Sequence, residues 1–327
     1  MSALSPSLSA ILPTDTYDTI RDTLDSLRAQ SVHDKLEIVI VATSVAGLGP
    51  EDGACEGFHS TTIVEVPQLE PMSWARAQGV RAASAPIVLF AESHSYPAPR
   101  ACETLIEAHQ GPWAAVGMAM GNANPATMRS WASLYLDYGP WVEASPRGVV
   151  DMLPGHNSSF KRSVLLEYED ELEKIMESGN HLTTDLRARG YELYLEPDAK
   201  TYHLNVTRPI SWLMERIVAG RAYAGFRSRP WSLQRRFLYM AAWPLIPAVR
   251  LRRILGYMRS SARGKELLPR VLPALAVNLV ISAFGEGIGY AIGAGGAMRH
   301  INEMELHRVQ YVRRADRPAS TRELSPS

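Results

Sequence analysis

Glu92 and His94 are the residues whose types and positions most strongly suggest chemistry. They follow the apolar run at residues 88–90, and two prolines come soon after them. A carboxylate and a neutral imidazole are both good ligands for ions such as Mn²⁺, whereas imidazole suits Mg²⁺ less well. The same two side chains could instead cap the loop by accepting backbone N–H bonds. The stretch therefore indicates either an ion-binding loop or a capped strand end.

The elements around this loop alternate between expected strands and expected helices. Apolar runs predict strands at 8–13, 36–43, 61–66 and 86–92, and amphipathic or alanine-rich segments predict helices at 15–30 and 73–84. This alternation predicts a doubly wound α/β unit, in which ligands bind beyond the carboxyl ends of the strands. Glu92 and His94 stand at such an end, as do Pro13, Thr14 and Asp15. An aromatic stretch without a clear element precedes residue 149.

The charges of the 327-residue chain are unevenly distributed, although they sum to zero. Residues 1–207 carry a net charge of −13, and residues 208–270 carry +12. A basic segment after an acidic body indicates a partner with anionic groups near that segment. Two cysteines are too few for a disulfide framework, and the first residues lack the features of a secretory signal.

Residues 208–312 are predicted to be a helical, basic and apolar region that associates with an anionic membrane surface, because arginines stand beside tryptophans and tyrosines. The apolar run Val271–Gly293 could cross the membrane or lie on it, since it contains Asn278 and Glu286. An ordinary helical subdomain is the alternative. Nucleic acid is not expected as a partner, because no nucleic-acid motif is present. Residues 313–327 are predicted to be a disordered tail.

Four blocks of residues 1–207 resemble family 2 glycosyltransferases, in the order that the family has them. They are the opening strand–Pro–Thr segment with its helix and next strand, "ARAQGVRAASAPIVLFAESH", "LPGHNSSFKRSVL" and "RARGYELYLEPDAKTYHLN". The resemblance implies an α/β fold of the GT-A type, a Rossmann-like domain for nucleotide-diphospho-sugar transfer, followed here by a helical C-terminal region. It also implies two ligands, a nucleotide-sugar donor and a divalent metal, Mn²⁺ or Mg²⁺.

The resemblance places Glu92 and His94 where the family has an Asp-x-Asp motif that binds the metal. His203 matches a late histidine that the family often uses as a further metal ligand. When bound, the metal would stabilise the negative charge that gathers on the leaving nucleoside diphosphate. Glu92, His94 and His203 are therefore the expected metal ligands.

The resemblance also implies a donor site. Arg76 matches the arginine of the family's "ARN" block and could face a phosphate, and Gly155-His156-Asn157 matches a loop beneath the sugar. Ala42 and Thr43 stand where the family usually carries an aspartate for the nucleobase or ribose. The expected donor-binding residues are Pro13, Thr14, Asp15, Arg76, Glu92, His156 and Asn157.

An inverting transfer needs a carboxylate to accept the proton of the attacking hydroxyl. The family's spacing brings Glu177 within one residue of this position, at the start of an expected helix. Asp185 lies deeper in that helix, where pairing with a nearby arginine is the more ordinary role, and His181 is a third candidate. Glu177 and Asp185 are the predicted catalytic residues.

These observations predict a metal-dependent, inverting glycosyltransferase at the cytoplasmic face of the cell membrane. It would transfer a sugar to a hydroxyl of a glycan or a lipid-linked acceptor. Two rival functions remain. The first is a catalytically weak relative that binds a nucleotide or glycan as a scaffold, and the second is a nucleotidyltransferase.

Overall fold

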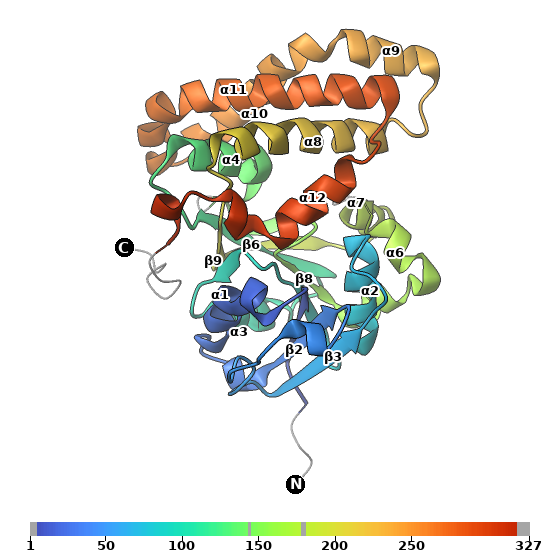
Figure 1. Cartoon of the computed structure of the whole chain (residues 1–327), viewed down its shortest axis with the longest axis vertical. Helices are drawn as coiled ribbons and strands as arrows, with labels where there is room; N and C mark the ends of the chain where they lie inside the picture. Colours follow the sequence, from blue (N-terminus) through green and yellow to red (C-terminus); the bar gives the residue numbers. More distant parts are fainter. Residues whose placement is uncertain (1–4, 143–144, 178–180, 319–327) are drawn as a thin grey trace. The chain divides into compact units, whose positions relative to one another are not determined.

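The computed structural model describes residues 5–142, 145–177 and 181–318. They form two compact units, each of which is built from two segments of the chain (Figure 1). The first unit contains the segments up to residue 121 and from 145 to 203. The second contains the segment from residue 122 to 144 and the segment from 204 to 318.

The first half of the sheet in the first unit is parallel, as the alternating pattern predicts. Its strands lie in the order β3-β2-β1-β4. Their bounds are β1 (Leu8–Pro13), β2 (Leu36–Ala42), β3 (Ser60–Glu65) and β4 (Ile87–Phe90). Every residue of β1, β2 and β4 is buried, which explains why these strands are almost continuously apolar in the sequence.

The second half of the sheet is antiparallel. It continues from β4 in the order β8-β6-β9-β5, and β7 also pairs with β9. The bounds are β5 (Ser95–Pro97), β6 (Ala115–Asn122), β7 (Gly148–Val150), β8 (Ser158–Lys161) and β9 (Leu193–His203). The segment from Leu193 to His203 is thus one long strand, and it connects with β5 near the carboxyl end of β4.

Among the described residues, six helices belong to the first unit. They are α1 (Tyr17–Arg28), α2 (Met72–Ala82), α3 (Ala101–Ala108), α5 (Arg162–Leu166), α6 (Leu172–Ile175) and α7 (His181–Ala188). The Thr16 side chain caps α1 by accepting a hydrogen bond from the Thr19 backbone N–H, at 3.2 Å. Gly79 lets α2 approach β1 closely, because a Cβ there would lie 2.5 Å from the Ile11 side chain.

The second unit is helical among its described residues. It contains α4 (Met128–Tyr138), α8 (Pro209–Arg227), α9 (Leu233–Ala241), α10 (Ile246–Arg259), α11 (Ala262–Ile292) and α12 (Ala297–Leu306). Glycines allow α8 and α11 to pack backbone against backbone. A Cβ on Gly220 would lie 2.1 Å from the Ser282 carbonyl oxygen. A Cβ on Gly285 would lie 2.3 Å from the Ile217 carbonyl oxygen.

Charged groups are buried inside this helical unit. The Arg216 guanidinium donates to both carboxylate oxygens of Asp137 at 2.7 and 2.9 Å, and it pairs with Glu215 at 2.7 Å. Burial opposes the charge of Glu215, but Arg216 and Arg308 hold the pKa of its carboxyl below the usual value. On α11, Glu286 pairs with Arg250 at 2.9 Å. The buried charges described here therefore lie in ion pairs with side chains of opposite charge.

The division of the chain differs from the boundary predicted at residue 208. The structure assigns residues 204–207 and the internal segment 122–144 to the helical unit. This internal segment contains α4, which lies within the aromatic stretch for which no element was expected. Of the predicted disordered tail at 313–327, the structure describes residues up to 318, including a short 3₁₀ turn at Arg314–Asp316. The remainder lies outside the described residues.

Candidate metal and donor site

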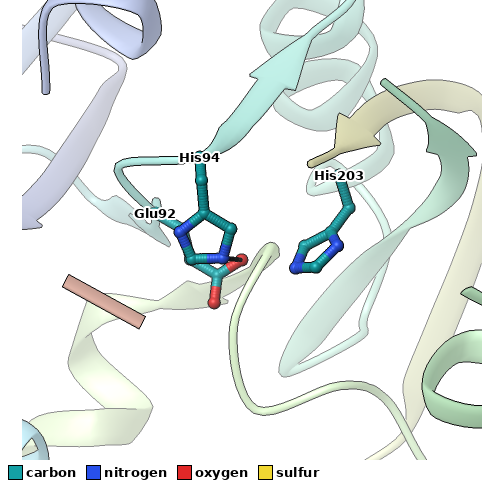
Figure 2. A group of neighbouring side chains, drawn as sticks. All are labelled: Glu92, His94 and His203. Carbon is teal, nitrogen blue, oxygen red and sulfur yellow. Dashed lines mark ion pairs between the residues drawn. The ribbon is translucent and has the colours of Figure 1, made fainter. Parts of the chain in front are cut away.

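Glu92, His94 and His203 converge at one point of the first unit (Figure 2). Each offers one ligand atom, and these atoms all lie within 4.8 Å of one another. The His94 Nε2 atom lies 3.7 Å from a Glu92 carboxylate oxygen, and the two imidazole rings meet edge to face with centroids 4.9 Å apart. All three residues are at most 5% exposed, which distinguishes this group from an ordinary acidic surface patch.

The sheet topology explains why these residues meet. The chain leaves β4 at Phe90 and passes through Glu92 and His94 into β5. The β5–β9 register then places Ser95 opposite His203. A strand pairing between residues more than 100 positions apart thus completes the group.

Hydrogen bonds fix the Glu92 carboxylate in place. Its Oε2 atom accepts bonds from Asn157 Nδ2 at 2.6 Å and from Ser95 Oγ at 2.9 Å. Asn157 Nδ2 also lies 3.0 Å from Ser95 Oγ. On the other side, His156 Nδ1 lies 3.4 Å from Glu92 Oε1. The predicted donor-site residues His156 and Asn157 therefore both contact the predicted metal-binding carboxylate.

The backbone around Glu92 is held as firmly as its side chain. Asn157 adopts a left-handed conformation with φ 54°, and its N–H donates to the Phe90 carbonyl oxygen at 2.8 Å. From α1, Thr23 Oγ1 donates to the Glu92 carbonyl oxygen at 2.8 Å. The loop after β4 is thus attached both to the segment before β8 and to α1.

This donor set fits a divalent transition-metal ion. Ligands that bind one ion at about 2.1 Å lie roughly 3 to 4 Å from one another, so small side-chain movements would bring the three atoms to binding distance. One carboxylate oxygen and two imidazole nitrogens suit Mn²⁺, Fe²⁺, Co²⁺ or Zn²⁺ better than Mg²⁺, which prefers oxygen ligands. His156 is 31% exposed at its side chain and lies beside the group as a further nitrogen.

The predicted residues at the end of β1 lie at the same carboxyl edge of the parallel strands. Pro13 ends β1, and the Thr14 N–H donates to the Val41 carbonyl oxygen at 2.9 Å. Thr14 is fully buried, and its hydroxyl donates to the Thr16 carbonyl oxygen. Asp15 is half-buried and accepts a bond from Thr19 Oγ1 at 2.7 Å. Among these, Asp15 alone presents a partly exposed charge.

The remaining candidates lie on helices or in the connections between them. Arg76 is half-buried on α2, and Glu177 is half-buried just after α6. His181 is exposed at the first position of α7. Asp185 Oδ2 accepts hydrogen bonds from Tyr168 at 2.7 Å and from Arg189 at 2.6 Å. The structure thus shows for Asp185 the arginine pairing that its helical position suggests.

Two residues of the site have no sequence prediction. Ser95 orients the Glu92 carboxylate, and Thr23 holds its backbone. Ser95 lies one residue beyond the Glu-x-His motif, so its place in the sequence could have identified it as a residue of the site. Thr23 gives no such signal, because it lies on the buried side of a helix 69 residues before Glu92.

The comparisons with known proteins agree with this architecture. A family model described as Glycosyl transferase family 2 matches residues 9–168. A comparison with curated proteins finds no match. Among solved structures, the mannosyltransferase PcManGT from Pyrobaculum calidifontis, in complex with GDP-Man and Mn²⁺, is similar with a TM-score of 0.50 and 18% identity. The similarity covers 86% of this chain and 87% of that one.

Two further solved structures are more distant. TarS 1–349 from S. aureus is 16% identical with a TM-score of 0.44, over 86% of this chain and 90% of that one. GalNAc-T7 with UDP, GalNAc and Mn²⁺ is 11% identical with a TM-score of 0.45, over 62% of this chain and 44% of that one. The chain therefore combines a GT-A α/β fold with a helical region, and its residues 9–168 match the model of glycosyltransferase family 2.

Proposed function

We propose that this protein is a metal-dependent glycosyltransferase that moves a sugar from a nucleotide-diphosphate sugar to a hydroxyl of a glycan or lipid-linked acceptor. One observation carries the proposal. A buried carboxylate and two imidazoles lie within 4.8 Å of one another at the carboxyl edge of a GT-A sheet, where such folds bind their ligands. The similar mannosyltransferase structure contains GDP-Man and Mn²⁺, which supports the same ligand classes here.

Each residue of the site has a role in this proposal. Glu92, His94 and His203 would hold the ion, and its charge would stabilise the negative charge of the leaving diphosphate. Asn157 and Ser95 keep the Glu92 carboxylate oriented, so that little reorganisation is needed when the donor binds. His156, which lies beside Glu92 and is partly exposed, contacts the donor phosphates. Asp15 and Arg76 bind other parts of the nucleotide.

The acceptor is activated by a carboxylate that takes its proton, as an inverting transfer requires. We assign this role to Glu177 rather than to Asp185. The Asp185 carboxylate is occupied by Tyr168 and Arg189, and loss of these bonds would cost stability. Replacement of Glu177 by glutamine should lower kcat at least about 100-fold with little change in donor affinity. Asp185→Asn should instead lower the melting temperature.

The decisive test measures transfer and donor hydrolysis with GDP- and UDP-sugars in the presence of Mn²⁺ and then of Mg²⁺. Turnover should need a divalent transition-metal ion and be weaker with Mg²⁺. It should fall at least about 100-fold in Glu92→Gln and in His203→Ala. His59→Ala is the matched control, since His59 is an exposed histidine of the same unit.

A scaffold that binds without catalysis is the second candidate, favoured by the Ala42-Thr43 pair at the expected nucleobase position. Calorimetry with Mn²⁺ and the nucleotide diphosphates separates the two functions. Metal-dependent binding without turnover of any donor would support the scaffold. Release of pyrophosphate from a nucleoside triphosphate would instead indicate a nucleotidyltransferase. Equal activity of wild type and Glu92→Gln would refute the proposed site.

A further inference from the structure

Helix α9 of the second unit exposes an apolar face that the proposed function does not use. The helix covers Leu233–Ala241 and contains no buried residue. Leu233, Phe237 and Leu238 are 80%, 67% and 63% exposed, and the positions i, i+4 and i+5 place them on one side of the helix. Leu245, in the turn after α9, is 67% exposed. We call these four residues the α9 face.

The opposite side of α9 attaches the helix to the rest of its unit. The Arg236 guanidinium donates to the carbonyl oxygens of Tyr290 and Ala291, at 3.0 and 3.2 Å, near the end of α11. The Tyr239 ring lies 5.4 Å from the Tyr290 ring. The usual arrangement of an amphipathic helix is therefore reversed, since polar and aromatic groups face the protein and apolar groups face away from it.

Arginines and aromatic rings border this face. Residues 227–270 contain 11 basic residues and only one acidic residue, Glu266. The Arg235 guanidinium lies 4.1 Å from the centroid of the Trp231 ring, and that of Arg227 lies 5.2 Å from it. Apolar side chains that project outward, with tryptophan and arginine beside them, match the interface of an anionic bilayer. Each arginine near such a surface adds about 1 kcal/mol of attraction.

Helix α11 is, among the described residues, the one helix long and apolar enough to cross a membrane, and 33% of its most apolar window is buried. It packs along α8, however, with Gly220 against Ser282 and Gly289 against the Arg221 carbonyl oxygen. If α11 crossed a bilayer, α8 and its charged side chains would enter the hydrocarbon with it. Each unpaired charge there costs about 3 kcal/mol or more. This packing favours a helix that lies along the membrane.

We propose that the second unit docks on an anionic lipid bilayer through the α9 face, with its arginines on the headgroup phosphates and α11 parallel to the surface. The cytoplasmic leaflet is the anionic one, so the protein would act at the cytoplasmic face of the cell membrane. Docking depends on the second unit alone and does not rest on the proposed sugar transfer.

The test is co-sedimentation of the full chain with vesicles of phosphatidylcholine, with and without about 30% phosphatidylglycerol. The protein should bind the anionic vesicles at least about tenfold more tightly than the neutral ones, and roughly 0.5 M NaCl should release most of it. Leu233→Glu combined with Phe237→Glu should weaken binding at least about tenfold. Since both residues are exposed, the thermal melt of this variant should match that of the wild type.

Ile210→Glu is the matched control. Ile210 is 79% exposed but lies in the first turn of α8, about 25 Å along that helix from the end that leads to α9. This variant should bind vesicles as the wild type does. Equal binding of the double variant, equal binding to neutral vesicles, or a sedimented form that only detergent releases would each overturn the proposal.

Two other occupants of the face are distinguishable in the same experiments. A dimer in solution that the double variant dissociates, without any vesicle binding, would assign the α9 face to a second copy of the chain. Binding of a short DNA duplex in preference to anionic vesicles would assign the basic segment to nucleic acid. Either result would overturn lipid docking, and neither bears on transfer activity at Glu92.

Discussion

The two units of this protein differ in the number of large apolar side chains that they expose. In the first unit β1, β2 and β4 are almost wholly apolar and buried, and its described residues include three exposed large apolar side chains, Val45, Val149 and Met152. The second unit exposes 14 such side chains among its described residues, while Arg216 and Glu215 are buried inside it. The proposed docking on a bilayer would use the apolar surface that the second unit exposes.

Buried polar groups also serve different ends in the two units. In the first unit a carboxylate and two imidazoles gather at the edge of a sheet, where an ion can complete the set. In the second unit the buried charges already neutralise one another, as Arg216 does with Asp137 and Glu215. Ligand atoms gathered around one point indicate binding, whereas charges that pair with one another indicate a structural role.

The largest loss of stability should come from removing one arginine from the buried ion pairs of the second unit. Arg216→Met would leave Asp137 without its bidentate partner and Glu215 with Arg308 as the arginine beside it. The free energy of unfolding should fall by about 3 to 5 kcal/mol, because the buried Glu215 carboxylate loses one of the two arginines that compensate its charge. Denaturant titration measures this loss. The control Arg21→Met breaks an exposed pair with Asp18 and should change the free energy of unfolding little, because water screens such a pair. Equal losses in the two variants would contradict the contrast between buried and exposed charges.

The packing of α8 on α11 should be nearly as sensitive. Gly220→Ala places a Cβ 2.1 Å from the Ser282 carbonyl oxygen, so the two helices must separate. We expect a loss of about 3 kcal/mol in thermal or chemical unfolding. Gly256→Ala is the control, since a Cβ at this position of α10 meets no atom within 4 Å. It should be neutral or stabilising by up to about 1 kcal/mol, and a comparable loss there would argue against close packing.

Acid should weaken the first unit through His109. Burial, helped by the charge of Lys161, lowers the pKa of His109 to about 3, so the folded protein holds this ring neutral. The unfolded ring has a pKa near 6.5, so the associated stability is complete above that value and is lost as the pH falls from about 6.5 toward 3. Between pH 7 and pH 5 the loss should be about 2 kcal/mol. Urea titrations of His109→Gln at both values should show a smaller decrease, and an identical decrease would exclude His109 as the cause.

The smallest effect concerns a single amide of α11. Asn278 is fully buried, and neither its Oδ1 nor its Nδ2 hydrogen-bonds to any of the described residues. Asn278→Leu should therefore be neutral or stabilise the second unit by about 1 kcal/mol in a melting experiment. Asn124 is also buried, but it bonds to Asn205 and Ser130. Asn124→Leu should be destabilising, and the same loss at Asn278 would reveal a partner for its amide.

The parallel half of the sheet could be predicted because each of its strands is a local apolar run. The strand predicted at 8–13 is β1 itself, and the others agree with β2, β3 and β4 to within two residues. Helix α4 carried a usable signal as well. Trp131, Leu134 and Tyr135 recur at helical spacing and are buried. The many aromatic residues of this stretch hid the helical periodicity, so no helix was predicted there.

Long-range pairings lay beyond local patterns. Nothing near Ser95 indicates that β5 pairs with a strand about 100 residues later. Local sequence patterns therefore could not predict that His203 lies near Glu92. The family resemblance predicted it. The same holds for Asp137, whose partner Arg216 lies 79 positions away. The division at residue 208 followed composition, which changes there, whereas the helical unit also needs a segment from inside the α/β unit.

That internal segment has a consequence for how the chain is made. Helix α4 ends at Tyr138, and α11, against which it packs, begins only at Ala262. At a synthesis rate of about 5 to 20 residues per second, on the order of ten seconds separate the two on the ribosome. During that interval α4, whose buried side includes Trp131 and Leu134, lacks the packing that α11 provides. The packing of the second unit therefore cannot be completed until α11 has been translated.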